Sequence, residues 1–595
     1  MPFGPQDAVA ARRAAYSSEA LRVARTTAPL DMVKQLQDGI LSESDETVNA
    51  CVAMIWRCCF TEDDTLRPEV DGLAATAIVK FLAERSLQFG GATEAIEGLC
   101  RLVKSTADTL ESHAVVALAS EWLPAVGVQR HGVAVRTMIF DLLEDLLTRR
   151  AQDLQNAGSS FLRGFCGAVD GERDPANVLR AFRLSKHVCC VLPAEVVAFH
   201  VSDVFDNLAA YFPVMFVPPP GCSVSKQDLR EALHGAMSEV VFVEHCIPFV
   251  LGKISSPSAA AKQDCLDVLR RCFACKADGA PPPAAQFIGE VLTSLRGEVL
   301  RLSALTTDSD RQMMQEVLST VCDAVRSVRM LDIGDVLSAL SPITTAAINT
   351  VETGSSSTRA YATMLHAVGA SDPTIANALV CYVIPLVTSI ALEPQATNVQ
   401  KDGAIAMVAA LLAACERCFS GGTSVRAPSA EARDQCAKLG HELLQSSRAF
   451  SRGTAADALA TLGVLGSHDA QWLPEDQRRG TYRALFLNAT TEGGDHVAAA
   501  LANAARVDGA TVADEIEHVT SESSALEPQQ LLVAYDALLR SGSLELTEAL
   551  LPRAFIAMQN PDAATTARWK LVRQGCDELG QRCQTPPKSV VQALM

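Results

Sequence analysis

Apolar and polar residues recur along most of the chain with the spacing of an α-helix. In the segment 131–149, one helical face carries apolar residues and the opposite face carries threonines and aspartates. We expect the first face to point inward and the second to meet water. The apolar face consists of Val135, Ile139, Leu142 and Leu146.

Polar residues mark the predicted starts of several helices. Asp174 suits an N-cap, and Pro175 suits the first helical position, where its missing N–H costs nothing. Ser225 is a second predicted cap, with Asp228 in the favourable first turn. Similar patterns predict helices in the ranges 48–59, 70–89, 94–104 and 112–122.

An aliphatic residue followed by proline recurs along the chain, and we interpret each occurrence as the opening of a helix. A basic residue follows each proline after 12 to 16 residues and begins a second apolar helix. In HEAT-type repeats, a basic residue at this place reaches the turn of a neighbouring repeat; the alternative is a solvated side chain. The prolines are Pro124, Pro248, Pro385 and Pro552, and the basic residues are Arg136, Lys262, Lys401 and Arg568.

Helix, short break and helix with apolar stripes form the unit of an α-solenoid. The spacing predicts about 13 to 15 repeats of about 40 residues, each burying its apolar face against its neighbours. The fold class is therefore predicted to be an all-α HEAT/ARM-type solenoid of antiparallel helix pairs. No segment is rich in β-structure signals, and glycine-rich breaks are predicted inter-repeat loops, with 421–431 expected to be disordered.

Composition narrows the function. The 595 residues carry a net charge of −18, which argues against direct binding to nucleic acid or an anionic membrane and permits basic protein partners. No apolar run is judged to reach the length of a membrane span, about 18 residues. The arginines of the first 25 residues are expected to belong to a first solenoid helix, with a mitochondrial presequence as the alternative.

Cysteine usage indicates a reduced compartment. The 19 cysteines lie mostly within apolar helical runs and are predicted to be buried free thiols. The pairs Cys272/Cys275 and Cys415/Cys418 have the spacing of metal or redox sites, but no matching pair accompanies them, so helix packing is favoured. His187, Cys189 and Cys190 would point to different faces of a helix. We predict no metal and no cofactor.

Catalytic motifs are absent from the sequence. A nucleophile elbow, a phosphate-binding loop and a metal-binding histidine pair are all missing. The carboxylate clusters Glu62–Asp64 and Glu144–Asp145 are interpreted as solvated rims. The chain is therefore predicted not to be an enzyme.

Two stretches supply candidate partner contacts. The charged turn 170–175 has a structural interpretation, helix capping with local ion pairs, and a functional one, a partner contact on the solenoid ridge. The segment Tyr211-Phe212-Pro213 is interpreted as a hydrophobic plug beneath a long loop, or as a docking patch if exposed. The candidate partner-binding residues are Asp170, Glu172, Arg173, Asp174, Tyr211 and Phe212.

Three of these pieces occur together in a known family. The run Phe165–Phe182 with its DGERDP core, then YFPVMFVPPP, then SKQDLREAL, resembles the large HEAT-repeat adaptor of cytosolic iron–sulfur protein assembly. That family is also known for nucleotide-excision repair and transcription, and its loss sensitises cells to methyl methanesulfonate. The resemblance assigns residues 1–352 to an N-terminal HEAT-repeat solenoid like that of the family and 353–595 to further HEAT-like helical repeats, with no family motif near the C-terminus.

The resemblance implies a non-enzymatic adaptor of the cytoplasm and nucleus. It would bridge subunits of the targeting complex and apo iron–sulfur clients, which include DNA repair and replication enzymes and the TFIIH helicase. Family members continue beyond this length, so the C-terminal repeats that dock on other subunits are expected to be shortened or missing. A nuclear-transport or trafficking cargo carrier is the alternative, and a protein that itself binds a cluster is a third.

Overall fold

In the computed structural model, the described residues are 3–61, 63–88, 92–274, 282–327, 333–491 and 494–522. They are almost entirely helical, and the β-structure among them is one isolated antiparallel bridge between Phe60 and Leu66. Contacts divide the chain into unit 1, Met1–Asp278 with Pro282–Ala284, and unit 2, Gly279–Pro281 with Ala285–Met595.

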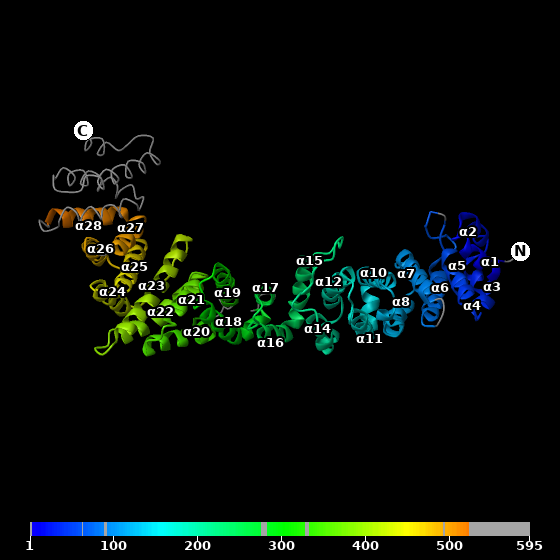
Figure 1. Ribbon diagram of the computed structural model, residues 1–595, viewed down its shortest axis with the longest axis horizontal. Coiled ribbons are helices and arrows are strands. Elements are labelled where there is room, and N and C mark those ends of the chain that lie inside the picture. Colours follow the sequence, from blue (N-terminus) through cyan, green and yellow to red (C-terminus); the bar gives the residue numbers. More distant parts are fainter. Residues whose placement is uncertain are drawn as a thin grey trace, which may run out of the picture. The chain divides into compact units, whose positions relative to one another are not determined.

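Unit 1 consists of helices in two rows (Figure 1). In one row α5, α7, α10, α12, α15 and α17 contact one another in order, and in the other row α6, α8, α11, α14 and α16 do so. Its helices are α1 (Pro5–Arg13), α2 (Ser18–Ala24), α3 (Pro29–Gln35), α4 (Gln37–Ile40), α5 (Asp45–Arg57), α6 (Gly72–Ser86), α7 (Ala92–Thr106), α8 (Ser112–Ala117), η1 (Leu118–Trp122), α9 (Leu123–Val126), η2 (Val128–Arg130), α10 (Val133–Arg149), α11 (Ala151–Val169), α12 (Pro175–Val191), α13 (Ala194–Phe199), α14 (Val201–Ala209), α15 (Lys226–Met237), η3 (Val240–Phe242), α16 (Val243–Lys253) and α17 (Ala259–Ala274).

Unit 2 repeats the arrangement. The helices α19, α21, α23, α25 and α27 contact one another in order, as do the even-numbered helices from α18 to α28. The short helix η4 (Pro283–Phe287) spans the border between the units. The others are α18 (Ile288–Ser303), α19 (Asp308–Arg326), α20 (Ile333–Thr353), α21 (Thr358–Gly369), α22 (Pro373–Ala391), α23 (Asn398–Ser420), α24 (Ala430–Leu444), α25 (Ala449–His468), α26 (Glu475–Ala489), α27 (Asp495–Ala505) and α28 (Gly509–Glu522).

These rows confirm the predicted fold class, an all-α solenoid of antiparallel helix pairs. In α10 the four residues of the predicted inner face are all buried. Asp174 caps α12 by accepting hydrogen bonds from the amides of Ala176 and Asn177, and Ser225 forms a capping box with Asp228 at α15, as predicted. Burial of the apolar stripes against neighbouring repeats therefore supplies the core.

Ion pairs tie successive repeats together, and Arg136 reaches the turn of a neighbouring repeat, one of the two alternatives given for the basic residues, whereas Lys401 reaches a helix. Arg136 pairs with Glu172 in the turn before α12, and Lys401 pairs with Glu442 of α24. Lys262 is buried, and Arg568 lies outside the described residues. Further pairs join residues 33 to 46 positions apart, about one repeat: Arg13–Glu46, Arg149–Asp108 and Arg448–Asp402.

The interpretation of the aliphatic–proline pairs as helix openings is wrong for two helices. Pro248 lies inside α16, and Pro385 lies inside α22. An interior proline removes one ladder hydrogen bond and costs about 3 kcal/mol. Both helices continue past the proline because the apolar residues on either side are buried, among them Ile247 and Ile384.

The segment 421–431 was expected to be disordered, and the structure contradicts this expectation. Its first nine residues follow an irregular path, and Val425 is buried. The indole N–H of Trp472 donates a hydrogen bond to the Val425 carbonyl at 3.1 Å, and Trp472 is itself fully buried. A contact with a residue 47 positions away orders the segment, and local composition does not reveal such a contact.

Two helices contradict the expectation that no segment is long and apolar enough to cross a membrane. By length and composition alone, α22 and α23 both qualify, and the bent pair Lys226–Met237 and Val240–Lys253 would add a third. Uncharged threonines and serines interrupt the apolar residues of α22, so the sequence does not show one continuous apolar run there. In unit 2, α22 packs against α20, α23 and α24, and α23 packs between α21 and α25.

Candidate protein-binding site

The predicted contact residues of the turn 170–175 surround a buried ion pair in unit 1. Gly171 has φ +76°, which suits glycine, and turns the chain so that Glu172 points inward. The guanidinium of Arg136 donates to both carboxylate oxygens of Glu172, at 2.8 and 2.9 Å. The amides of Arg173 and Asp174 donate to the same carboxylate at 2.8 and 2.9 Å.

Glu172 is held as a carboxylate. Its side chain has no exposed surface, and burial alone would raise its pKa. The hydrogen bonds from Arg136 and from the two backbone amides outweigh burial, so the pKa of Glu172 lies below its ordinary value. The negative charge of Glu172 is therefore compensated by Arg136 and by the two backbone amides.

The second predicted segment is anchored on this turn. The Tyr211 hydroxyl donates to the Glu172 carbonyl at 2.8 Å, and the Tyr211 ring meets Phe182 edge-on with centroids 5.3 Å apart. Burial raises the pKa of Tyr211 to about 12, so the hydroxyl keeps its proton and remains a donor. Phe212 is 6% exposed and its ring lies near those of His234 and Phe249.

Beyond this anchor the chain emerges at the surface. The amide of Val214 donates to Asp264 at 3.3 Å, which fixes the last buried residue of the segment. Met215 is 72% exposed and Val217 is 82% exposed, and Pro218 to Pro220 are exposed as well. Two exposed apolar side chains therefore lie on a loop whose base is held by hydrogen bonds.

A cavity of about 270 Å³ lies beside this loop. It is bounded by the turn at Glu172, the start of α12, residues 211–216 and α15. Most of its walls are aromatic or aliphatic, and Arg173 is exposed at its charged end. The lining residues are Glu172, Arg173, Pro175, Val178, Phe182, Tyr211, Val214, Met215, Phe216 and Leu229.

The structure brings the predicted site residues together on two adjoining turns. Glu172 and Phe212 are buried, Asp174 and Tyr211 are half-buried, and Asp170 and Arg173 are exposed. The geometry is that of the structural interpretation, capping with an ion pair and a hydrophobic plug. Their role as partner contacts stays a prediction.

Sequence reasoning missed the exposed tip of the loop and a buried charged group below it. The signal for the tip was available, because the flanking prolines keep Met215 to Val217 out of regular structure. The charged group gave no signal, since His234 lies on α15 whereas Asp264 and Asp267 lie on α17. Nothing in their spacing brings them together.

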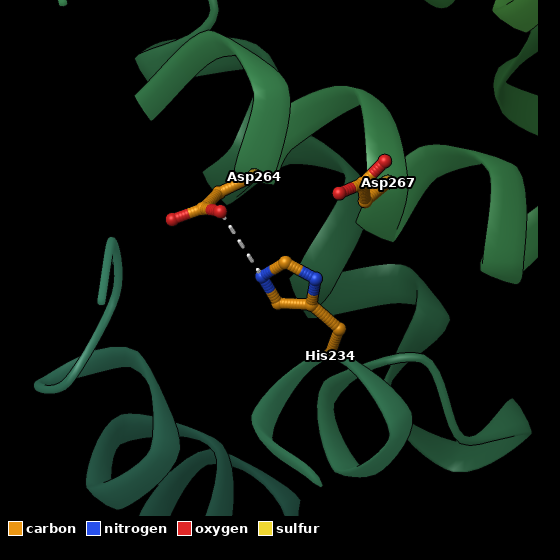
Figure 2. A group of neighbouring side chains, drawn as sticks. All are labelled: His234, Asp264 and Asp267. Carbon is orange, nitrogen blue, oxygen red and sulfur yellow. Dashed lines mark ion pairs between the residues drawn. The ribbon is translucent and has the colours of Figure 1, made fainter. Parts of the chain in front are cut away.

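That group is the one set of three potential metal ligands found among the described residues. His234, Asp264 and Asp267 have ligand atoms within 4.8 Å of one another. Figure 2 shows the His234 ring directed at Asp264, with Nε2 3.7 Å from the nearer oxygen, and Asp267 to one side. Arg230 already donates to Asp264 at 2.5 Å and to Asp267 at 3.0 Å. A metal ion would have to displace this cation, so the donor set fits an ion-pair network better.

Burial sets the charge state of this network. Burial, together with the positive charges of Arg230 and Arg271, lowers the pKa of His234 to about 3. The Nε2 atom of His234 is buried and forms no hydrogen bond within the part of the chain that the structure describes. Burial also raises the pKa of Asp264 more than Arg230 lowers it. His234 is therefore neutral at neutral pH.

This arrangement predicts an acid-sensitive contribution to stability. The unfolded chain binds a proton on His234 near pH 6.5, whereas the folded chain does so only near pH 3. The stability that His234 contributes is thus present above pH 6.5 and is lost as the pH falls. Between pH 7 and pH 5 the free energy of unfolding should drop by about 2 kcal/mol more in the wild type than in His234→Gln. Urea denaturation at both pH values measures this difference, and equal drops would contradict the assignment.

One of the two cysteine pairs lies wholly within the described residues. Cys415 and Cys418 are both buried, and burial raises the pKa of each thiol. Cys275 lies outside the described residues. Cys190 and Cys381 are exposed, contrary to the expectation of burial, because each lies on the outer face of its helix.

A serine and a histidine side chain lie in contact on the surface of unit 1. The Ser202 hydroxyl lies 3.2 Å from Nε2 of His245. The other ring nitrogen, Nδ1, is buried and forms no hydrogen bond with a described residue, so no third group among them orients the ring as nucleophile activation requires.

A larger hollow lies in unit 2. Its volume is about 720 Å³, and exposed Val399 and Phe450 are among its lining residues. The Arg359 guanidinium lies 4.6 Å from the centre of the Phe450 ring, and Asp402 is paired with Arg448. These contacts indicate no particular ligand.

The match to a known protein family lies mainly in unit 1. The family model described as Dos2-interacting transcription regulator of RNA-Pol-II, MMS19_N, matches residues 33–301. This range contains all three sequence pieces that suggested the family. The resemblance to the MMS19 family is confirmed.

Curated relatives agree with the family model. The MMS19 nucleotide excision repair protein homolog of Danio rerio is 27% identical over 36% of this chain and 20% of its own length. The Arabidopsis thaliana homolog is 29% identical over 33% of this chain and 18% of its own length, and the Homo sapiens homolog is 28% identical over 34% and 19%. The matched part therefore spans about a fifth of these relatives.

Among solved structures, Kap121p overlaps 92% of this chain and 53% of its own length, with a TM-score of 0.43 and 12% identity. Importin Beta overlaps 91% and 69%, with a TM-score of 0.31 and 11% identity. The fold assignment rests on the helix rows and not on these overlays. The family-model match ends at residue 301, and the predicted division at 352 and 353 stays a prediction.

Proposed function

We propose that this chain is a non-enzymatic scaffold that presents apo iron–sulfur client proteins to the cytosolic assembly machinery. The observation that carries the proposal is the family match over residues 33–301, with the two anchored turns at its centre. DNA repair and replication enzymes are the proposed clients, with the TFIIH helicase among them. A linked role in DNA repair and transcription follows, in keeping with the names of the curated relatives.

The physical character of the chain supports this proposal. Stacked helix pairs offer a long surface, and solenoids use such surfaces to hold large partners. A net charge of −18 disfavours direct contact with nucleic acid or anionic membranes. We propose that the chain acts in the cytoplasm and nucleus through protein contacts, without a cofactor and without catalysing a reaction.

Affinity capture of the tagged full chain from cells tests the proposal. We expect targeting-complex subunits and iron–sulfur proteins to be enriched over a tag-only control. The rival function is a nuclear-transport or trafficking cargo carrier, which the acidic charge also suits. Enrichment of Ran and karyopherin cargo, without assembly subunits, would favour the carrier and contradict the scaffold.

A further inference from the structure

The cavity beside residues 211–217 has the features of a peptide-anchoring site. We propose that it receives one apolar side chain of a partner protein and that Arg173 pairs with a carboxylate close to that side chain. This inference rests on the proposed function, that the chain is a protein-binding scaffold. The inference specifies where one segment of a partner binds and which side chains that segment must carry.

The cavity is large enough for one apolar side chain but too small to enclose a drug-sized molecule. Its volume, about 270 Å³, falls just below the range of pockets that enclose drug-sized molecules, about 300 to 1,000 Å³. Its walls include the rings of Phe182, Tyr211 and Phe216 and the side chains of Val178 and Leu229. Buried pockets with such walls hold the apolar anchors that dominate protein–protein binding.

The rim of the cavity is already in place. The hydrogen bonds of Tyr211 to the Glu172 carbonyl and of the Val214 amide to Asp264 hold the base of the loop. Met215, exposed by 72%, lines the cavity and extends its apolar surface outward. A partner would therefore not have to order the base of this loop on binding, which removes one cost of association.

The charge at the rim selects an acidic neighbour for the apolar anchor. Arg173 is exposed, and its guanidinium forms no ion pair with a described residue. The nearby charges are engaged: Arg136 neutralises Glu172, and the Asp174 carboxylate accepts amide hydrogen bonds from α12. Asp170 is not among the residues that line the cavity. Arg173 is thus the charge left to meet a ligand.

Selection of a displayed library of random 12-residue peptides on the purified full chain tests this inference. We expect enrichment of peptides with a large apolar residue and an Asp or Glu within a few positions. Arg173→Glu and Met215→Asp should each weaken binding of the enriched peptides about tenfold. Both side chains are exposed, so neither change should unfold the chain. Arg163→Glu, an exposed arginine of the neighbouring helix α11, is the matched control and should leave binding unchanged.

Three results would overturn the inference: no enriched motif, an enriched motif lacking the acidic residue, or equal binding to the wild type and both cavity variants. The same variants in the affinity capture separate this inference from the proposed function. If the wild type and the variants capture assembly subunits and clients equally, the cavity is not the site that binds these partners, although the proposed scaffold function is supported. If the wild type captures none, the scaffold fails, whatever the peptides show.

Discussion

Replacing Glu172 with glutamine is expected to cost about 3 kcal/mol of unfolding free energy, because it leaves the half-buried charge of Arg136 without its partner. The Glu172 side chain has no exposed surface and that of Arg136 is 13% exposed, so water replaces little of the lost interaction. Glutamine keeps an oxygen that accepts from the amides of Arg173 and Asp174. The loss therefore reports mainly on the ion pair.

Urea denaturation together with hydrogen exchange of α10 and α12 measures this loss. Exchange is needed because repeat proteins can unfold in parts, and the pair joins α10 to the turn before α12. Glu144→Gln on α10 is the control, since Glu144 is exposed and should change stability by less than about 0.5 kcal/mol. If both variants lose the same stability, the pair does not hold the turn.

The sign of the pH dependence follows from the lowered pKa of Glu172. A carboxylate whose pKa is lower in the folded chain stabilises that chain above its ordinary pKa, near 4.3. The stabilisation is lost as the pH falls from there through the folded pKa. Glu172→Gln should lack this acid-sensitive part, so its stability should approach that of the wild type as the pH falls through the lowered pKa of Glu172.

Replacing Phe212 with alanine is the second change with a large expected effect. Truncation of a buried phenylalanine costs about 3 to 5 kcal/mol. Phe212 is 6% exposed and its ring centroid lies 5.7 Å from that of Phe249 and 6.1 Å from that of His234. We also expect faster exchange at the Val214 amide, because Phe212 seats the segment that donates to Asp264.

Phe199→Ala is the matched control for this change. Phe199 belongs to the neighbouring helix α13 and is 81% exposed, so its loss should alter stability by less than about 0.5 kcal/mol. Thermal unfolding of the two variants beside the wild type makes the comparison. Equal melting temperatures for Phe212→Ala and the wild type would mean that the plug does not secure the loop.

Features decided by nearby residues were predictable from the sequence. The caps at Asp174 and Ser225 and the inner face of α10 each depend on residues within one or a few helical turns. The spacing of the basic residues singled out Arg136, with a contact to a neighbouring repeat and a solvated side chain as the two alternatives. It did not name Glu172, which lies 36 positions away.

Features decided by distant residues were not predictable. Pro248 and Pro385 read as helix starts, and only the burial of their neighbours keeps α16 and α22 continuous. Trp472 orders the segment at Val425 from 47 positions away. At the candidate site, the turns were identified, but the exposure of Met215 and the proximity of His234 to Asp264 depend on how α15 and α17 pack.

The division of roles within the site follows from burial. Glu172, Tyr211 and Phe212 shape the two turns from inside, and Arg173 and Met215 face outward beside the cavity. Changes to the first group should act through stability, and changes to the second through binding. Stability and binding measurements on the same variants can therefore distinguish residues that support the turns from residues that contact a partner.

The most direct test of the scaffold is reconstitution from purified components. The full chain is mixed with purified targeting-complex subunits and one apo iron–sulfur client, and the mixture is examined by size-exclusion chromatography with light scattering. The scaffold predicts a single species that contains the chain, the subunits and the client. Separate elution of the chain, together with a stable complex between the chain and Ran bound to GTP, would contradict it.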